Sequence, residues 1–457
     1  MLASARAGGL RPHPNHLGPA LLAAALLFAA VVPPIGPAHA MQIQTIKSPG
    51  GIEAWLVEEH SVPLMALKFA FEGGNAQDPP GKEGLANFLT AMLDEGAGDL
   101  TSSAFQELME GIAMRMSYED GRDAFYGNFE TLTVNRDKAV ELLRLALNKP
   151  RFDDDAVERI RKQLLANLIY DERDPEKVAA REWYALAFEG HSYGRPANGT
   201  AATIGAIARA DLETYRKRVF AKSNLRVTAV GDIDAATLGK LLDTVFGGLE
   251  ANADLVPVSV TSPVNGGRQK VIEMNVPQSV AVFGLGAMPR KHPDFMTAFV
   301  LNQLIGGGGF ASRLMEEVRE KRGLAYSVYT YMQPYRHASI LSGGVATRNE
   351  ALAQTLEVIR AELKHIALEG PTPQELDNAK KFLVGSYALR FDTSAKIASQ
   401  LLTILMDGFG PDYVEKRNGW IEAITLDDAR RVAKSLLATD NLIVTIVGKP
   451  ANTAGKG

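Results

Sequence analysis

The chain has 457 residues, a net charge of −4 and no cysteine. This length exceeds that of one ordinary domain and predicts two or three domains, each large enough to bury a core. The lack of cysteine excludes a disulfide scaffold, a thiolate metal cluster and a cysteine nucleophile. A slightly acidic net charge does not indicate a basic surface that could bind nucleic acid, so we expect no nucleic-acid partner.

Residues 1–40 have the features of a secretory signal peptide. Two arginines precede an apolar run at Ala20–Val32, and residues 38–40 have the small-x-small pattern of a cleavage site. A helix of this run would reach about 20 Å, less than the roughly 30 Å of a bilayer core. We therefore predict an exported, periplasmic protein with no stable membrane insertion after cleavage. An uncleaved membrane anchor is the alternative.

The rest of the chain contains an internal repeat. Asn224–Gly231 reads NLRVTAVG, and Asn441–Gly448 reads NLIVTIVG. Both are runs of β-branched residues that end at a glycine, which is typical of buried strands. A helical segment precedes each run, at Asp211–Lys222 and at Leu426–Leu437. The repeat indicates a duplication.

Other elements follow the same order in both halves. Long amphipathic stretches at Asn135–Leu165 and Arg348–Val384 are each broken at a proline, which separates two helices. The strands expected at the start of each half are Trp55–Val57 and Leu64–Phe71, then Val271–Met274 and Ser279–Gly284. These features predict an α+β fold of two homologous halves, each a mostly antiparallel sheet covered by helices on one face.

The predicted boundaries follow from composition. The N-terminal half covers residues 41–250, and the C-terminal half covers residues 268–450. Residues 251–267 are rich in Ala, Pro, Val, Ser and Gly and carry few charges, which is typical of an interdomain linker. Residues 451–457 are predicted to be a disordered tail.

The histidines beyond residue 40 are too dispersed to hold zinc together. They occupy positions 60, 191, 292, 337 and 365, and no H-x-x-x-H or H-x-x-E-H spacing occurs. No helix can therefore present two imidazoles to one metal ion. We expect these histidines to be surface or capping residues, and the chain to have no metal or cofactor of its own.

One segment keeps the outline of a zinc motif without its ligands. Residues 84–96 read GLANFLTAMLDEG. This resembles the G-x-A-H-F-L-E-H-M-L-x-x-G segment of the pitrilysin-like (M16) peptidases, the family of insulin-degrading enzyme and the mitochondrial processing peptidase. Asn87 stands in place of the first histidine ligand, Thr90 in place of the glutamate general base, and Ala91 in place of the second histidine.

The third zinc ligand of that family is missing as well. It is a glutamate before an acidic segment, here Tyr170–Pro175, and the aligned positions are Ala166 and Asn167. A catalytic zinc needs about three N or O ligands and a water. The helical spacing of the apolar residues persists at Leu85, Phe88, Leu89, Met92 and Leu93. The resemblance spans residues 41–450 and implies a pitrilysin/LuxS-like metallohydrolase-type fold with its halves in a clam-shell arrangement.

A second stretch is similar to the part of the family that holds substrate. Residues 312–326 follow the family pattern S-R-L-x-x-x-x-R-E-x-x-G-L-x-Y closely. Active members use an Arg and a Tyr, seven residues apart, to hold the substrate backbone near zinc, and Arg319 and Tyr326 have this spacing. A helix predicted over Ala311–Lys321 would end where a strand over Leu324–Met332 begins.

Two interpretations of this pair are open. Arg319 and Tyr326 can meet and donate hydrogen bonds to a peptide carbonyl and to the oxyanion that forms there. Alternatively, Arg319 pairs with Glu316 and Tyr326 packs in the sheet. The preceding run of Gly306, Gly307, Gly308 and Gly309 has three readings: a loop bordering a substrate chamber, a plain flexible loop, or a phosphate cradle. The cradle is disfavoured because no G-K-[ST] follows the run.

Small members of the family work as pairs in which one subunit supplies zinc, so the resemblance implies a zinc-less, exported subunit that is inactive alone. It would form a heterodimer with a zinc-bearing H-x-x-E-H homologue, bind a peptide or unfolded protein substrate, and supply Arg319 and Tyr326 to the partner's zinc site. The alternative is a structural or peptide-binding family member with no role in proteolysis. A self-sufficient metalloprotease would need a zinc site that the sequence does not offer.

Overall fold

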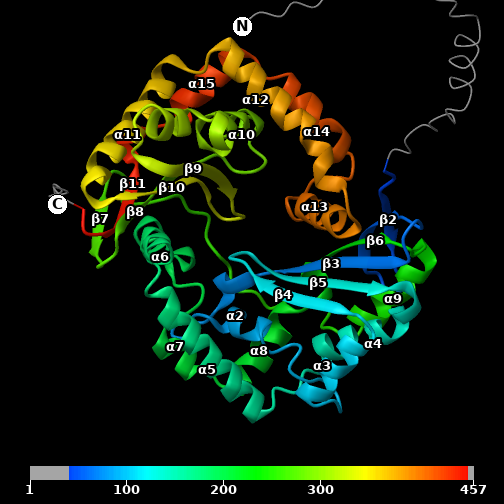
Figure 1. Ribbon diagram of the computed structural model, residues 1–457. Coiled ribbons are helices and arrows are strands. Elements are labelled where there is room, and N and C mark those ends of the chain that lie inside the picture. Colours follow the sequence, from blue (N-terminus) through cyan, green and yellow to red (C-terminus); the bar gives the residue numbers. More distant parts are fainter. Residues whose placement is uncertain (1–40, 451–457) are drawn as a thin grey trace, which may run out of the picture. The chain divides into compact units, whose positions relative to one another are not determined.

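The computed structural model describes residues 41–450 (Figure 1). The predicted signal peptide, residues 1–40, and the predicted tail, residues 451–457, lie outside the described residues. From Ile43 on, the described chain belongs to one unit. None of the described helices is long and apolar enough to span a bilayer.

The first sheet has six strands in the order β1-β2-β6-β3-β5-β4. Neighbouring strands are antiparallel, except that β2 and β6 are parallel. The strands are β1 (Gln44–Lys47), β2 (Glu53–Glu58), β3 (Leu64–Glu72), β4 (Arg115–Asp120), β5 (Ala124–Leu132) and β6 (Leu225–Gly231).

The second sheet repeats this topology with five strands, in the order β7-β11-β8-β10-β9. Here β7 and β11 are the parallel pair, and the other neighbours are antiparallel. Its strands are β7 (Gln269–Glu273), β8 (Gln278–Gly286), β9 (Ala325–Pro334), β10 (Ser339–Arg348) and β11 (Ile443–Gly448). The repeated motif forms β6 in one sheet and β11 in the other, each between its parallel partner and its antiparallel partner. The predicted α+β fold with two mostly antiparallel sheets is confirmed; the clam-shell arrangement stays a prediction.

The helices also divide between the two halves of the chain. Those before residue 250 are α2 (Leu85–Thr90), α3 (Ser102–Gly111), α4 (Arg136–Asn148), α5 (Asp154–Asp171), α6 (Pro175–Ala187), α7 (Ala201–Ala206), α8 (Arg209–Val219) and α9 (Ala235–Phe246). Those after it are α10 (Phe295–Asn302), α11 (Leu352–Glu369), α12 (Pro373–Gly385), α13 (Ser394–Met406), α14 (Tyr413–Glu422) and α15 (Leu426–Leu436). The proline-broken stretches form the pairs α4–α5 and α11–α12, as predicted.

Local signals start several of these helices. Asp174 caps α6 by accepting the N–H groups of Glu176 and Lys177, and Pro175 takes the first helical position. Thr372 and Glu375 form a capping box at α12. Such pairs fix where a helix begins, so the boundaries predicted at prolines are close to those observed.

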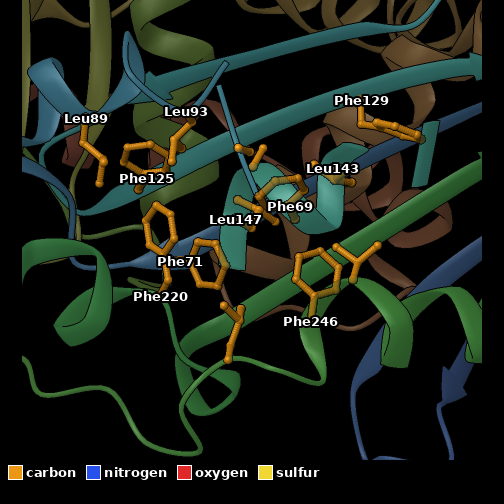
Figure 2. Packing of buried hydrophobic residues seen from close by; sticks show 14 of the residues in the cluster. Phe69, Phe71, Leu89, Leu93, Phe125, Phe129, Leu143, Leu147, Phe220 and Phe246 are labelled. Carbon is orange, nitrogen blue, oxygen red and sulfur yellow. The ribbon is translucent and has the colours of Figure 1, made fainter. Parts of the chain in front are cut away.

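The main core of the first half lies between its sheet and its own helices. Figure 2 shows its aromatic centre, where Phe71 of β3 and Phe220 stack with ring centroids 4.5 Å apart. Phe69 meets Phe246 of α9 edge to face, with centroids 5.3 Å apart. Because side chains alternate along β3, Met65, Leu67, Phe69 and Phe71 all point to this core. The other face of the sheet therefore needs a separate cover.

That cover comes from the opposite half, which corrects the prediction of helices on one face only. Helix α13 packs on β3 and β6, and helix α6 packs on β8 and β11. Leu402 of α13 lies against Ala70 and Ala124. Trp183 of α6 packs on the second sheet and donates Nε1–H to the carbonyl of Ile443 at 3.2 Å. The two halves therefore exchange one helix each.

The repeated threonine in the NLxVTxVG motif makes the same contact in both halves. Thr228 Oγ1 donates to the carbonyl of Ala398 on α13 at 2.9 Å, and Thr445 Oγ1 donates to the carbonyl of Ala179 on α6 at 2.7 Å. Both threonines are fully buried. A buried hydroxyl is costly without a partner, and the exchanged helix provides it. The repeat is thus a repeat of packing as well as of sequence.

Two predicted helices differ from the structure. The one expected over Ala311–Lys321 is a 3-10 turn at Gly309–Ala311 followed by a π-helical turn at Met315–Glu320. The zinc-motif helix, α2, ends at Thr90, and turns follow it. The Thr90 hydroxyl donates to the carbonyl of Asn87 at 2.7 Å, an arrangement in which a side chain competes with the helical ladder.

Candidate functional site

The degenerate zinc-motif positions lie on α2 and its C-terminal edge. Asn87 Nδ2 donates to Asp120 Oδ1 at 3.1 Å, and Asn75 Nδ2 donates to Asp120 Oδ2 at 2.9 Å. The carboxylate at the end of β4 is thus held between two amides. Thr90 is occupied by its bond to its own helix, and Ala91 has no polar atom to offer. Of the motif positions, only Asn87 belongs to a side-chain polar network, which it forms with Asp120 and Asn75.

The N-terminus of α2 is held by a residue that sequence reasoning missed. Asp78 accepts the backbone N–H groups of Gly84, Leu85 and Ala86 at 2.9–3.1 Å. Burial raises the pKa of Asp78 to about 8, while these N–H donors oppose the rise. A capping residue normally sits directly before its helix, but that place is taken by Gly84 in the left-handed conformation. Because Asp78 does not directly precede α2 in the sequence, the sequence did not indicate that it caps this helix.

Arg319 and Tyr326 are brought together in the second half. Arg319 lies near the end of the π-helical turn Met315–Glu320, and Tyr326 is the second residue of β9. The guanidinium carbon of Arg319 is 5.1 Å from the centroid of the Tyr326 ring. The same guanidinium carbon is 4.5 Å from the centroid of the Phe310 ring. The cation is therefore held by two aromatic rings.

This cluster of Phe310, Arg319 and Tyr326, the aromatic clamp, is open to solvent. Tyr326 is 79% exposed and Phe310 is 69% exposed. The Tyr326 hydroxyl has no hydrogen-bond partner among the described residues. Glu316 pairs with Lys321, not with Arg319, whose nearest carboxylate is Glu320 at 3.6 Å. The alternative reading, with Arg319 paired to Glu316 and the tyrosine packed in the sheet, is wrong.

The glycine run positions Phe310. Gly306 and Gly307 belong to a π-helical turn, Gln303–Gly307. A Cβ at Gly306 would lie 2.6 Å from the backbone nitrogen of Thr330 on β9, so a larger residue would push this turn off the strand. Gly309 has φ 57°, in the left-handed region that glycine favours. The sequence signal for this contact is an aromatic residue, Phe310, directly after the glycine run.

Comparison with known proteins places this geometry in a family. The description "Insulinase (Peptidase family M16)" matches residues 56–201, and "Peptidase M16 inactive domain" matches residues 206–383. The chain is 30% identical over 347 residues to the "Non-peptidase homolog YmxG" of Helicobacter pylori, covering 76% of this chain and 79% of that protein. This chain belongs to the M16 peptidase family.

Other M16 proteins support the same assignment. An uncharacterized zinc protease of Mycobacterium tuberculosis is 26% identical over 89% of this chain and 93% of its own length. The crystal structure of a peptidase M16 inactive domain from Pseudomonas fluorescens superposes with a TM-score of 0.85 at 27% identity, covering 90% of this chain and 98% of that one. A protease structure from Helicobacter pylori shares the fold, with a TM-score of 0.81 at 17% identity and coverage of 89% and 100%.

The residues at the M16 zinc positions do not fit zinc. Ala91 and Ala166 have no donor atom, and Asn87 is engaged with Asp120. Within residues 41–450, no three His, Asp or Glu side chains are grouped so that they could hold a metal ion. Zinc sites need about three such ligands. The chain is an M16 member whose residues at the zinc positions of the family do not fit the metal.

Proposed function

We propose that this chain is the non-catalytic, zinc-less subunit of an exported M16-type peptidase heterodimer. It would bind an extended peptide segment, while a zinc-bearing H-x-x-E-H homologue supplies the metal and its chemistry. Arg319 and Tyr326 would hold the substrate backbone and donate hydrogen bonds to the carbonyl that the partner attacks. Residues 1–40 favour a periplasmic location for the pair.

One observation carries the proposal: the residues at the zinc positions cannot together hold the metal, whereas Arg319 and Tyr326 are in contact and the Tyr326 side chain is exposed. The guanidinium of Arg319 lies between two largely exposed aromatic rings, and its side chain is itself 29% exposed. Stacking on aromatic faces reduces the freedom of the guanidinium, so less entropy is lost when it binds a carbonyl. The free hydroxyl of Tyr326 adds a second donor beside it.

Co-expression with the zinc-bearing homologue and a peptide cleavage assay test the proposal. We expect no cleavage by this chain alone and cleavage by the mixture. Arg319→Ala or Tyr326→Phe should lower the rate of the mixture by roughly 10²-fold, since each removes one oxyanion donor. Co-purification of the two subunits should be unchanged.

Matched controls are available in the same elements. Arg322 lies just past the same turn and pairs with Glu317 at 2.6 Å, and Tyr331 lies further along β9. Arg322→Ala and Tyr331→Phe should leave the rate within about twofold. Normal cleavage by both Arg319→Ala and Tyr326→Phe would refute the role of the pair. A stable complex that never cleaves peptide would instead favour the structural or peptide-binding function.

A further inference from the structure

A cavity in the C-terminal half shares no lining residue with the aromatic clamp. Its volume is about 420 Å³, and it is bounded by α10, the end of β9, the 3-10 turn Tyr387–Phe391, α13 and α14. Cavities of a few hundred Å³ with mostly apolar walls are typical of small-molecule sites. The apolar part of the wall includes Phe295, Phe299 and Met332.

The charged groups of this cavity do not balance. Its lining contains Arg290, Arg390 and Arg417, but only one acidic residue, Asp407. Arg290 is neutralised because its Nε donates to Asp407 Oδ2 at 2.7 Å. Among the described residues, no carboxylate lies within ion-pair distance of Arg390 or Arg417. Two positive charges therefore face one cavity without a counter-ion.

Of these two arginines, Arg417 of α14 gives the stronger evidence for a bound anion. Its residue is only 4% exposed. Its Nη1 donates to the carbonyl of Leu383 at 3.1 Å and to Asn418 Oδ1 at 2.8 Å, and its guanidinium lies 4.1 Å from the ring centroid of Tyr387. The Tyr413 hydroxyl, which also accepts from Arg290 Nη2 at 2.7 Å, is its remaining side-chain partner, and no described carboxylate balances its charge. A buried cation without an anion is strongly disfavoured unless a ligand completes the site.

Tyr387 adds an independent signal. The residue is 7% exposed, lines the same cavity, and its hydroxyl has no hydrogen-bond partner in the part of the chain that the structure describes. Buried polar groups normally have partners, so each exception needs an explanation. A buried hydroxyl and a buried guanidinium that face one cavity, both incompletely bonded, have the chemistry of an anion site.

The geometry points to a binding site for an organic carboxylate that carries an aromatic or branched apolar group. The carboxylate would accept from Arg417, Arg390 and the Tyr387 hydroxyl, since guanidinium pairs match the two oxygens of a carboxylate. The apolar group would pack on Phe295 and Phe299. Such a carboxylate is present in a small free acid and at the C-terminus of a peptide. The site shares no residue with the aromatic clamp and does not depend on the proposed function.

Calorimetric titration of the full chain tests the inference. The probes are N-acetyl-L-phenylalanine, its amide, and a six-residue peptide ending in phenylalanine as free acid or amide. We expect each acid to bind at least about tenfold more tightly than its amide, since the amide loses the charge-assisted bonds. A free acid as tight as the peptide would identify small acids as the ligand, whereas a tighter peptide would identify a chain terminus.

Variants separate binding from folding. Tyr387→Phe should weaken the acid about tenfold without lowering the melting temperature, since it removes a hydroxyl that has no partner in the free protein. Arg390→Ala, on an exposed residue, should weaken it by a similar factor, and Arg348→Ala, an exposed arginine elsewhere, should have no effect. Arg417→Lys should abolish binding where it folds. Equal binding of acid and amide, tighter binding of inorganic phosphate, or unchanged affinity in Tyr387→Phe would overturn the inference.

Discussion

Replacing Gly284 on β8 with alanine adds one methyl group and tests how closely α6 packs on the second sheet. A Cβ at Gly284 would lie 2.5 Å from Cζ2 of Trp183 and 3.0 Å from the carbonyl oxygen of Leu341. Carbon atoms pack at about 3.5–4.0 Å, so the indole must move by roughly 1 Å. It is fully buried and anchored by its bond to the carbonyl of Ile443, so it cannot move without cost.

The magnitude follows from this clash. We expect Gly284→Ala to lower the free energy of unfolding by about 2–3 kcal/mol, as overpacking does in cores. Trp183→Phe removes the clashing atom and should cost about 1–2 kcal/mol through lost volume and one lost hydrogen bond. In the Trp183→Phe background, Gly284→Ala should cost only about 1 kcal/mol. The coupling between the two positions is then at least about 1 kcal/mol.

Urea unfolding followed by far-ultraviolet circular dichroism measures this cycle, because Trp183→Phe removes one of the three tryptophans and alters the fluorescence. The control is Gly419→Ala in α14, where a Cβ would meet nothing within 4 Å. That variant should gain about 0.5–1 kcal/mol from the higher helix propensity of alanine. If Gly284→Ala and Trp183→Phe add within about 0.5 kcal/mol, α6 does not rest on β8 as described.

Three further predictions address other contacts. Asp78→Asn should cost about 1–2 kcal/mol in urea unfolding, because an amide accepts fewer of the three N–H groups at the start of α2. Burial raises the pKa of Glu375, but bonds from Arg313 and Thr372 outweigh it and hold the pKa at about 2, below the unfolded value of about 4.3. The stability from this contact is therefore present above about pH 4.3 and lost as the pH falls towards 2; Glu375→Gln should cost about 2 kcal/mol at pH 7, and a deficit that persists undiminished at pH 2 would contradict this. In the cleavage assay of the mixture, Phe310→Ala should lower the rate about tenfold, less than Arg319→Ala, because it loosens the guanidinium without removing a donor.

Much of the fold was predictable because its signals are local. Prolines and caps mark the helix pairs, and the β-branched runs that became β6 and β11 have no polar alternation because both of their faces are buried. The exchange of α6 and α13 was not predictable in this way. An amphipathic pattern indicates that a helix has an apolar face, but it does not indicate which sheet packs against that face. Only the threonine shared by both motifs hinted at an equivalent partner in each half.

The candidate site was predictable where two residues are close in sequence. Arg319 and Tyr326 are joined by a short turn, so their meeting depends on local geometry. Phe310 lies between two π-helical turns, Gln303–Gly307 and Met315–Glu320, and such turns have no reliable sequence signal. The cavity lined by Arg390 and Arg417 is formed by five separate elements. Arg390 and Arg417 lie on different elements, so their spacing in the sequence does not indicate that they line the same cavity.

The geometry of α2 explains how a zinc motif can lose its ligands and keep its outline. Leu85, Phe88 and Leu89 are at most 2% exposed and belong to the main core of the first half, whereas Asn87, Thr90 and Ala91 lie on the half-buried face. A substitution at a core position would leave a cavity worth several kcal/mol. A substitution on the half-buried face costs little, provided that each polar group finds a partner, as Asn87 does in Asp120. The helix start is secured separately by Asp78. Stability therefore keeps the helix and its flanks, and only catalysis within this chain would require the histidines and the glutamate.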